Sequence, residues 1–417
     1  MGGLDPWAVA AVVAAALVLG SAIYIVLRWR RAPAARRALA AVGAACFAAG
    51  VLAGAWVFHL AGERIGPTAS TPVPPVAAPP PPASAPVPAS VPASPAEAPS
   101  RPVQTVIYVA NRDSVTTYSL GSNGNITPLT ILSGPATGLS APSAIAVDAR
   151  GYIYVVNRGG WLGEKPGINV YPPGSNGEVV PIRTIAGPAA DLHEPTGIAL
   201  DGGGKMYITN GFIMEEGHYV PSEGDVAVYS AASNGNTGPV ARITGRRYVT
   251  TFPHYWMYRP VGLALDHLGS LYVLNPGNEG IAKYRADSEG LVPPLSRIAG
   301  PTTALIRGTA INVNRRGDVF VADAEANAVM EFAGSATGDT APIGTISGPA
   351  TGISNPQGIA LDANGDIFVA NRIGYSNASV TEYAPGSNGN VAPIATISGP
   401  FTELADPTGI AIGPLQR

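Results

Sequence analysis

The sequence repeats itself from residue 105 to the C-terminus, and a repeat of this kind restricts the possible folds more than any other feature of the chain. One unit contains PSAIAVD at residues 142–148 and GYIYVVN at residues 151–157. Related units start 48 to 65 residues apart, at Pro195, Pro260, Gly308 and Pro356, and a last fragment starts at Pro407. Each unit is therefore expected to be one small element that buries its apolar face against its neighbours.

Each unit predicts four short β-strands. The first strand resembles PSAIAVD and ends in an Asp-x-x-Gly turn, in which the Asp side chain caps the turn and Gly supplies a positive φ. The second strand alternates apolar and aromatic residues, and the third resembles INVY at residues 168–171. An Asn-Gly pair then predicts a tight hairpin turn into a fourth strand such as IRTI at residues 182–185. These pairs begin at Asn123, Asn176, Asn234 and Asn388.

The repeats predict an all-β fold, a six-bladed β-propeller of four-stranded blades over residues 105–417. Four antiparallel strands in a unit of about 50 residues are typical of a propeller blade. The chain enters at Thr105 in a second strand and leaves after Pro407 in a first strand. Pairing of these N- and C-terminal strands would complete a sixth blade beside the five internal units and would remove the exposed edges of an open array.

These motifs resemble the NHL-repeat family, whose units have the pattern Pro-x-Gly-Ile-Ala-Val-Asp-x-x-Gly-x-Ile-Tyr-Val. The resemblance covers residues 105–417 and all six blades, and it implies a six-bladed propeller. It implies little about function, because this and related six-bladed groups include protein- and RNA-binding modules, extracytoplasmic sensor domains of bacterial receptor kinases, lyases and lactonases.

Residues 1–65 predict a transmembrane hairpin. The uncharged runs 7–27 and 38–62 are each long enough, as helices, to cross about 30 Å of hydrocarbon. The segment between them, RWRRAPAARR at residues 28–37, carries five arginines, whereas the outer flanks are nearly neutral. Because positively charged short loops stay in the cytoplasm, both ends of the hairpin are expected outside it.

Residues 66–104 predict a Pro/Ala-rich extended linker, with 14 prolines between residues 67 and 102. The expected location is therefore the bacterial inner (cell) membrane, with the Arg-rich loop 28–37 cytoplasmic and the propeller on the periplasmic, extracytoplasmic side. From residue 105 onward the chain has 18 Lys and Arg against 25 Asp and Glu. This acidic balance argues against a nucleic-acid partner, which needs a basic surface.

The strand order places the long insertions on one face of the predicted propeller. Turns from the first to the second strand and from the third to the fourth lie on one face, here named the turn face. Loops from the second to the third strand, and links to the next blade, lie on the other face, here named the loop face. The insertions all belong to the loop face: 159–167, 211–224, 246–259 and 373–379.

The insertion 246–259, RRYVTTFPHYWMYR, is the segment richest in aromatic and arginine side chains. Such side chains dominate binding hot spots, so the insertion predicts a platform for a protein, peptide or glycan. The alternative is a loop folded onto a small core of its own. The predicted binding residues are Trp161, Arg246, Arg247, Tyr248, Phe252, His254, Tyr255, Trp256, Tyr258 and Arg259.

Histidines and carboxylates on the loop face favour a second hypothesis, a metal-dependent lyase or lactonase-like hydrolase. Imidazole and carboxylate groups are suitable ligands for Zn or Ca and can also act as acid and base. The predicted ligands are His193, Glu215, Glu216 and His218, although no spacing motif links them. The primary hypothesis requires no cofactor.

An amide or acid ends every second strand: Asn111, Asn157, Asn210, Asn275, Asp323 and Asn371. Because every blade has one, a structural role in satisfying local backbone groups is expected. A polar ring lining an axial site is the alternative.

The primary functional hypothesis is a non-enzymatic, membrane-anchored binding or sensor module outside the cytoplasm. The enzyme is the first alternative, and a structural component of an envelope complex is the second.

Overall fold

The computed structural model describes the repeat region, with short internal gaps. The described residues are 104–159, 165–211, 213–215, 218–220, 224–244, 257, 259–276, 280–372 and 378–416. The predicted transmembrane hairpin and nearly all of the Pro/Ala-rich linker lie outside them. Among the described residues, no helix has the length and apolarity needed to cross a membrane.

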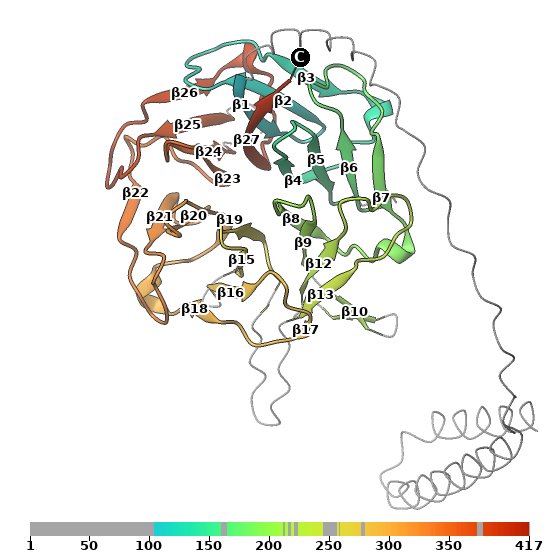
Figure 1. Ribbon diagram of the computed structural model, residues 1–417. Helices are drawn as coiled ribbons and strands as arrows, with labels where there is room; N and C mark the ends of the chain where they lie inside the picture. Colours follow the sequence, from blue (N-terminus) through green and yellow to red (C-terminus); the bar gives the residue numbers. More distant parts are fainter. Residues whose placement is uncertain are drawn as a thin grey trace, which may run out of the picture. The chain divides into compact units, whose positions relative to one another are not determined.

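Six sheets surround a central axis, as the sequence predicts, and each contains four antiparallel strands; the sheet of blade 2 has the short β17 as a fifth strand at its outer edge (Figure 1). Blade 1 contains β4 (Pro142–Val147), β5 (Ile153–Asn157), β6 (Gly167–Tyr171) and β7 (Arg183–Ala186). Blade 2 contains β8 (Pro195–Leu200), β9 (Met206–Asn210), β12 (Asp225–Tyr229) and β13 (Ala241–Thr244). Blade 3 contains β14 (Gly262–Leu265), β15 (Ser270–Leu274), β16 (Ile281–Arg285) and β18 (Ser296–Ile298).

Blade 4 contains β19 (Gly308–Val313), β20 (Val319–Asp323), β21 (Ala328–Phe332) and β22 (Gly344–Ser347). Blade 5 contains β23 (Pro356–Leu361), β24 (Ile367–Asn371), β25 (Ser379–Tyr383) and β26 (Ala395–Ser398). Blade 6 contains β27 (Gly409–Leu415), β1 (Gln104–Ala110), β2 (Ser114–Ser119) and β3 (Thr130–Ser133). Beside these lie a hairpin of β10 (Ile213–Glu215) and β11 (His218–Val220) and the short β17 (Gly290–Leu291). Four short 3-10 helices precede the links between blades: η3 (Pro135–Thr137), η4 (Pro188–Ala190), η6 (Pro301–Thr303) and η7 (Pro400–Thr402).

Blade 6 closes the ring by joining the two ends of the repeat region. β1 and β27 are antiparallel and pair from Gln104 with Leu415 to Ala110 with Gly409. The Tyr108 hydroxyl donates a 2.8 Å hydrogen bond to the Pro414 carbonyl across this pair. The predicted closure is therefore confirmed. Because β1 runs toward the loop face, the polypeptide that precedes Gln104 joins the propeller at the turn face.

The Asp-x-x-Gly turns have the predicted geometry. In blade 1, Asp148 Oδ1 accepts hydrogen bonds from the backbone N–H groups of Arg150 and Tyr152, each at 2.9 Å. Gly151 has a φ of 82°, a conformation that Gly adopts without steric cost. The corresponding Asp or Asn makes the same pair of bonds in blades 2 to 5.

The Asn-Gly pairs do not form the tight hairpin turns predicted from the sequence, and that prediction was wrong. In blade 1 the connection from β6 to β7 runs from residue 172 to residue 182. Gly177 within it forms a parallel bridge with Leu132 on β3 of the preceding blade, and Asn176 Oδ1 accepts a 2.9 Å bond from Ile131 N. The fourth strand is the outer edge of its blade, so it has unpaired backbone groups that the neighbour's turn satisfies.

Equivalent bridges join every pair of neighbouring blades, including blade 6 to blade 5 through Gly124 and Ile397. The four Asn-Gly turns, together with the turns at Gly290 and Gly338, therefore connect neighbouring blades around the rim.

Aromatic residues at the ends of the third strands fill the space between the sheets. They are at most 1% exposed: Tyr118, Tyr171, Tyr229, Tyr284, Phe332 and Tyr383. The Tyr171 hydroxyl donates to the Thr137 carbonyl at 2.7 Å, which satisfies its polar end. Burial raises the pKa of Tyr171 to about 12, so the phenol stays protonated at neutral pH.

Candidate functional site

The insertion between blades 2 and 3 is attached to the core at its C-terminal end. Met257 is 1% exposed and packs in the cluster that joins these blades, which includes Val226 and Leu263. Arg259 is exposed, and its Nη2 lies 3.8 Å from Glu194 Oε2. The other predicted binding residues lie outside the described residues: Trp161, Arg246, Arg247, Tyr248, Phe252, His254, Tyr255, Trp256 and Tyr258.

The predicted metal ligands are described only in part. His193 Nε2 lies 2.6 Å from Asp191 Oδ1. Glu215 and His218 pair across the β10–β11 hairpin, where the backbone alone is described, and Glu216 lies outside the described residues. No group of three or more His, Cys, Asp or Glu residues in the described part of the chain is arranged to hold a metal ion. The metal site stays a prediction.

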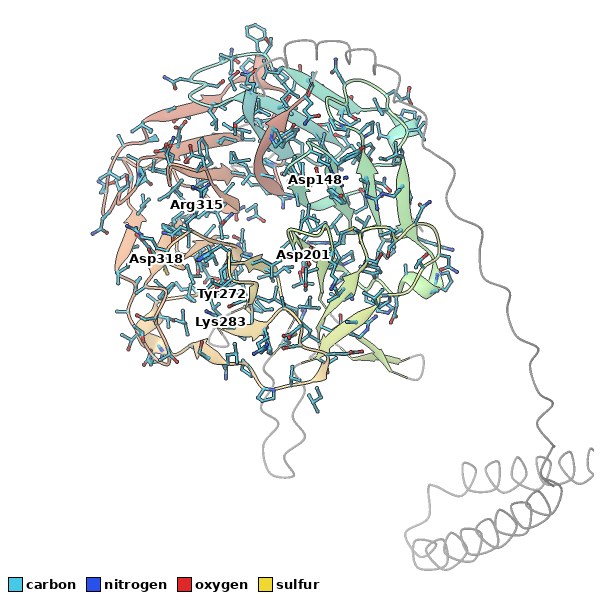
Figure 2. The ribbon with its side chains drawn as sticks, in the orientation of Figure 1. Asp148, Asp201, Tyr272, Lys283, Arg315 and Asp318 are labelled. Carbon is cyan, nitrogen blue, oxygen red and sulfur yellow. The ribbon has the colours of Figure 1, made fainter. Side chains whose placement is uncertain are left out.

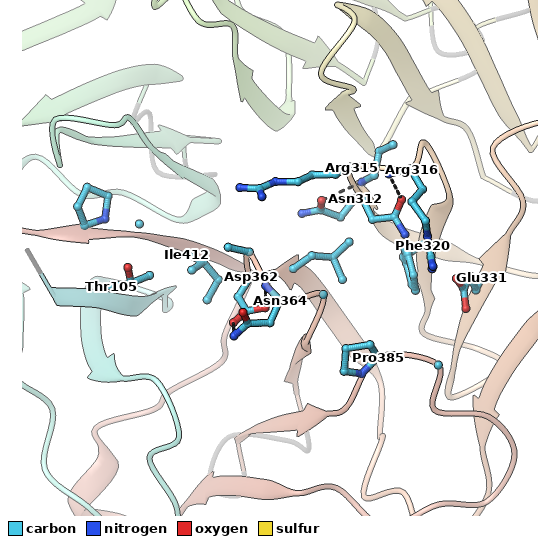
Figure 3. A pocket seen from close by; sticks show the side chains of 18 residues that line it. Thr105, Asn312, Arg315, Arg316, Phe320, Glu331, Asp362, Asn364, Pro385 and Ile412 are labelled. Atoms are coloured by element: carbon cyan, nitrogen blue, oxygen red, sulfur yellow. Dashed lines mark hydrogen bonds between the residues drawn. The ribbon is translucent and has the colours of Figure 1, made fainter.

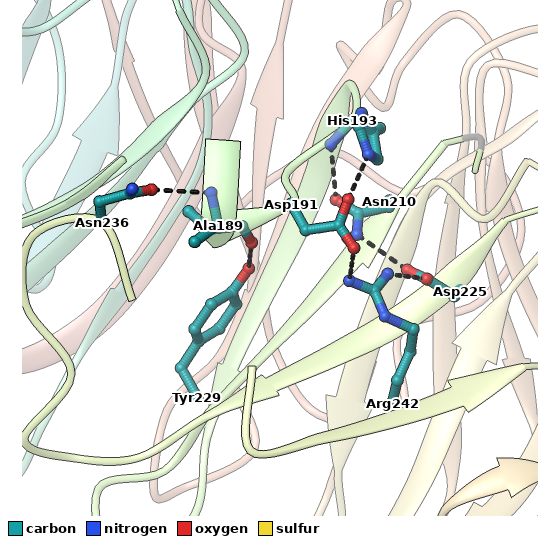
Figure 4. Close-up of polar contacts among 9 residues, drawn as sticks. Ala189, Asp191, His193, Asn210, Asp225, Tyr229, Asn236 and Arg242 are labelled. Carbon is teal, nitrogen blue, oxygen red and sulfur yellow. Dashed lines mark hydrogen bonds and ion pairs between the residues drawn. The ribbon is translucent and has the colours of Figure 1, made fainter. Parts of the chain in front are cut away.

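His193 belongs to a charged network that sets blade 2 apart (Figure 4). Arg242 donates to Asp191 at 2.5 Å and also to Asp225, which has no exposed surface. Asn210 donates a 2.8 Å bond to the other oxygen of Asp225. Burial raises the pKa of Asp225, and the Arg242 guanidinium opposes that rise. Because a buried carboxylate needs a hydrogen-bonded partner, Arg242 stabilises Asp225 and, through Asp191, the position of the His193 ring.

Blades 5 and 6 have an uncharged residue in place of Asp225. Asp225 pairs with Asn210, whereas Ser379 pairs with Asn371 in blade 5 and Ser114 is the corresponding residue of blade 6. The second-strand amides of these two blades donate instead to a threonine hydroxyl two positions further along the third strand, from Asn111 to Thr116 at 3.1 Å and from Asn371 to Thr381 at 3.0 Å. The charged network therefore distinguishes blade 2 from blades 5 and 6.

The amides and acids that end the second strands have structural roles. Asn157 Oδ1 accepts a bond from Ser140 N at 2.9 Å, and Asp323 Oδ2 accepts one from Ile306 N at 2.7 Å. All six side chains of this set are at most 3% exposed. Five of them accept a hydrogen bond from the link that enters their own blade, and Asn275 donates to the Gly280 carbonyl at 3.4 Å, in agreement with the structural interpretation of this set.

The loop face has a cavity of about 660 Å³ at the propeller axis, and the sequence did not predict its lining. Three arginines line it, each directly after the asparagine at the end of a second strand: Arg112 of blade 6, Arg158 of blade 1 and Arg372 of blade 5. Arg372 forms an ion pair with Asp406 through Nε and Oδ1 at 2.7 Å. The dipeptide Asn-Arg at residues 111–112, 157–158 and 371–372 is a sequence signal that alignment of the repeats could have found.

The floor of this cavity is a ring formed by the second residue of each first-strand motif: Ser143, Thr196, Val261, Thr309, Gln357 and Thr408. Ser143 Oγ donates to the Pro195 carbonyl of the next blade at 2.7 Å, and Thr309 Oγ1 donates to the Pro356 carbonyl at 2.7 Å. Below this ring the axial space falls to about 80 Å³ between the apolar first strands. The loop-face cavity is therefore a cup with a narrow floor.

A second cavity, of about 620 Å³, lies at the turn face among blades 4, 5 and 6 (Figure 3). Figure 2 shows Asp148, Asp201 and Arg315 around the centre of the ring. Asn314 and Asp362 line this cavity, but their Oδ1 atoms cap their own turns. Asn364 Nδ2 also donates to Asp362 Oδ2 at 3.2 Å. Most polar groups at this cavity are thus already bonded within the fold.

Comparison with known proteins supports the fold alone. No family model and no curated protein matches the chain. A protein of unknown function from Bacteroides caccae has a similar structure, with a TM-score of 0.50 and 9% identity, over 75% of this chain and 100% of that one. A chain of a nidogen/laminin complex has a TM-score of 0.49 and 14% identity over the same shares. The described residues form an all-β, six-bladed propeller of four-stranded blades, and the NHL-type repeat stays a prediction from the motifs.

Proposed function

We propose that this chain is a membrane-anchored binding module whose loop face captures a protein, peptide or glycan outside the cytoplasm. One observation carries the proposal. The arginine-lined cavity shares the loop face with the insertions, whereas both strand ends of blade 6 lie at the turn face. The preceding linker therefore enters blade 6 at the face opposite the cavity. The point where the linker is attached does not lie on the proposed binding surface.

The insertion 246–259 connects blades 2 and 3 at the loop face, and its aromatic and arginine residues are the second part of the proposed binding surface. Ligand pockets are concave, and aromatic and arginine side chains dominate binding hot spots. The cavity volume falls within the roughly 300–1,000 Å³ typical of small-molecule pockets, so it suits a terminal group of a larger ligand.

The membrane topology is tested by phosphatase fusions in a bacterial host. A phosphatase fused after Arg417 should be active, and one fused at Ala34 should be inactive, because the fused phosphatase works only outside the cytoplasm. Activity at both positions, or at Ala34 alone, would contradict the proposed orientation.

The binding role is tested by replacing residues 247–255 with a Gly/Ser segment of equal length, which keeps the buried Met257. Full-length protein in detergent is applied to peptide and glycan arrays, and thermal unfolding checks the fold. We expect loss of at least tenfold in captured signal with an unchanged midpoint. The matched control, Arg150→Gln and Arg285→Gln on the turn face, should bind as the parent does. Equal capture by parent and loop variant, or absence of capture by either, would overturn the proposal.

A further inference from the structure

We propose that the loop-face cavity binds a carboxylate-bearing sugar, with the acid group on Arg112 and Arg158 and the sugar hydroxyls on the ring of Ser and Thr oxygens. This inference rests on the proposed function, because it names the ligand class of the same face.

The first argument is the charge at the cavity mouth. The charged side chains that line the cavity are Arg112, Arg158, Arg372 and Asp406. Three further charged residues, Arg259, Arg307 and Glu194, come directly before the first-strand motifs of their blades. The propeller as a whole has more acids than bases, so the mouth is a basic region on an acidic domain. A local excess of one charge attracts ligands of the opposite charge.

The second argument is that two of these arginines have unused donors. Arg259 lies near Glu194, Arg372 pairs with Asp406, and Arg307 Nη2 donates to Asn355 Oδ1 at 3.4 Å. Arg112 and Arg158 are exposed, and their guanidinium groups form no hydrogen bond or ion pair with any residue that the structure describes. A guanidinium binds a carboxylate through two parallel N–H···O bonds, and both groups are fully charged at neutral pH.

The third argument is that the fold does not require a cation at these positions. The residues that follow the second strands of blades 2, 3 and 4 are Gly211, Pro276 and Ala324. These blades form the same four-stranded sheets without an arginine there. Arg112 and Arg158 are therefore available for a ligand at no cost to the propeller.

The fourth argument is the chemistry of the cavity floor. The hydroxyl groups of Ser143, Thr196 and Thr309 each donate to the proline carbonyl of the next blade, at 2.7 to 2.8 Å. Their protons are committed, so these hydroxyl groups can act toward a ligand only as acceptors, and Thr196 already accepts one bond from the Thr209 hydroxyl at 2.9 Å. The cup thus offers acceptors at its floor and cationic donors at its rim. A molecule with several hydroxyl donors and one carboxylate, such as a uronic or sialic acid, complements both.

The inference is tested by titrating full-length protein in detergent with glucuronate, galacturonate and N-acetylneuraminate, using calorimetry. Glucose, galactose and inorganic phosphate are the comparison ligands. We expect at least one acidic sugar to bind at least tenfold more tightly than the neutral sugars, without displacement by equimolar phosphate. The double variant Arg112→Gln and Arg158→Gln should weaken that binding at least tenfold. The control Arg150→Gln and Arg285→Gln has the same net charge and should stay within twofold of the parent.

Failure of this inference differs from failure of the proposed function. If no acidic sugar binds, if glucose binds equally, or if phosphate displaces the sugar, the ligand class is wrong. An equal loss in the control pair would show that general charge, and not the cup, attracts the ligand. If array capture still depends on residues 247–255 in any of these cases, the loop face remains a binding surface. If no array ligand and no sugar binds, both proposals fail.

Discussion

The two ends of the propeller axis have cavities of similar volume, about 660 Å³ at the loop face and about 620 Å³ at the turn face. The two cavities differ in how far their polar side chains are hydrogen-bonded within the fold. At the turn face, Asn314 and Asp362 cap their own turns. At the loop face, Arg112 and Arg158 have no partner among the described residues. The difference is one of number, because Arg315 at the turn-face cavity also has no partner among the described residues, whereas the loop-face cavity has two such arginines on neighbouring blades.

The two faces also differ in which residue types have a positive φ. On the turn face, Gly residues such as Gly151 adopt the positive φ values of the Asp-x-x-Gly turns. On the loop face, non-Gly residues do so in five blades, directly before the first-strand motif: Ala141, Glu194, Arg259, Asn355 and Asp406. Each such residue costs roughly 1–2 kcal/mol. In blade 1 the Ala141 carbonyl accepts a 3.1 Å bond from Arg158 N.

The largest effect is expected from removing β27, the C-terminal strand that pairs with β1 and closes the ring. Deleting residues 408–417 removes β27, the inner strand of blade 6, and exposes the buried side chains of Val106 and Tyr108. We expect loss of cooperative unfolding, since the whole stability of a domain is only about 5–15 kcal/mol. Calorimetry and size-exclusion chromatography measure the outcome. Deleting residues 416–417 is the control and should leave the transition unchanged; a cooperative transition in the longer deletion would contradict ring closure as a requirement.

An intermediate effect compares one polar residue from each cavity. Asp362→Ala removes the acceptor of two backbone bonds, from Asn364 N and Asp366 N at 2.8 and 2.9 Å. It should lower the free energy of unfolding by about 1–2 kcal/mol. Arg158→Gln should change it by no more than about 0.5 kcal/mol, because an exposed side chain without partners contributes little. Urea denaturation measures both, and equal costs would erase the distinction between the faces.

The smallest effect is a pH dependence confined to the turn face. Burial pushes the pKa of Asp266 upward, but hydrogen bonds from Ser270 and the charge of Lys283 outweigh it, so the pKa lies below 3.8. The unfolded chain therefore binds the proton more readily. Stability from this group is present above pH 3.8 and is lost as the pH falls through the lowered pKa. Urea denaturation at pH 5, 4 and 3 should show a shallower decline for Asp266→Asn than for the parent. Arg158→Gln should keep the pH dependence of stability that the parent shows. A change in that dependence would argue against its origin in Asp266.

Much of the fold follows from local patterns in the sequence. The period-two strands, the Asp-x-x-Gly caps and the incomplete units at the two ends predicted four-stranded blades, their number and their closure. The prediction from the Asn-Gly pairs was wrong because Gly177, with its positive φ, forms a bridge with Leu132 of another blade. A local sequence pattern does not distinguish such a turn from a hairpin turn. Met257 shows the same limit, since an insertion rich in surface-type residues also contains a core residue.

The candidate site was predictable only as a face. Strand order assigned the insertions to the loop face, but the sequence-based candidates are the residues of the insertions, and the cavity lining comes from ordinary blades. Three Asn-Arg pairs were visible in the repeats. Whether their arginines line a cavity depends on how close each blade places them to the common axis, which the sequence does not show.

By itself the sequence determined the repeating unit, because side-chain alternation and turn chemistry are properties of neighbouring residues. It also determined the ring, because half-units at both ends can satisfy their backbone groups only by pairing with each other. Only the tertiary structure decided which repeated position meets at the axis and which carries a free charge. Closing six sheets into a circle brings Arg112, Arg158 and Arg372 to one cavity, although up to 260 residues separate them along the chain.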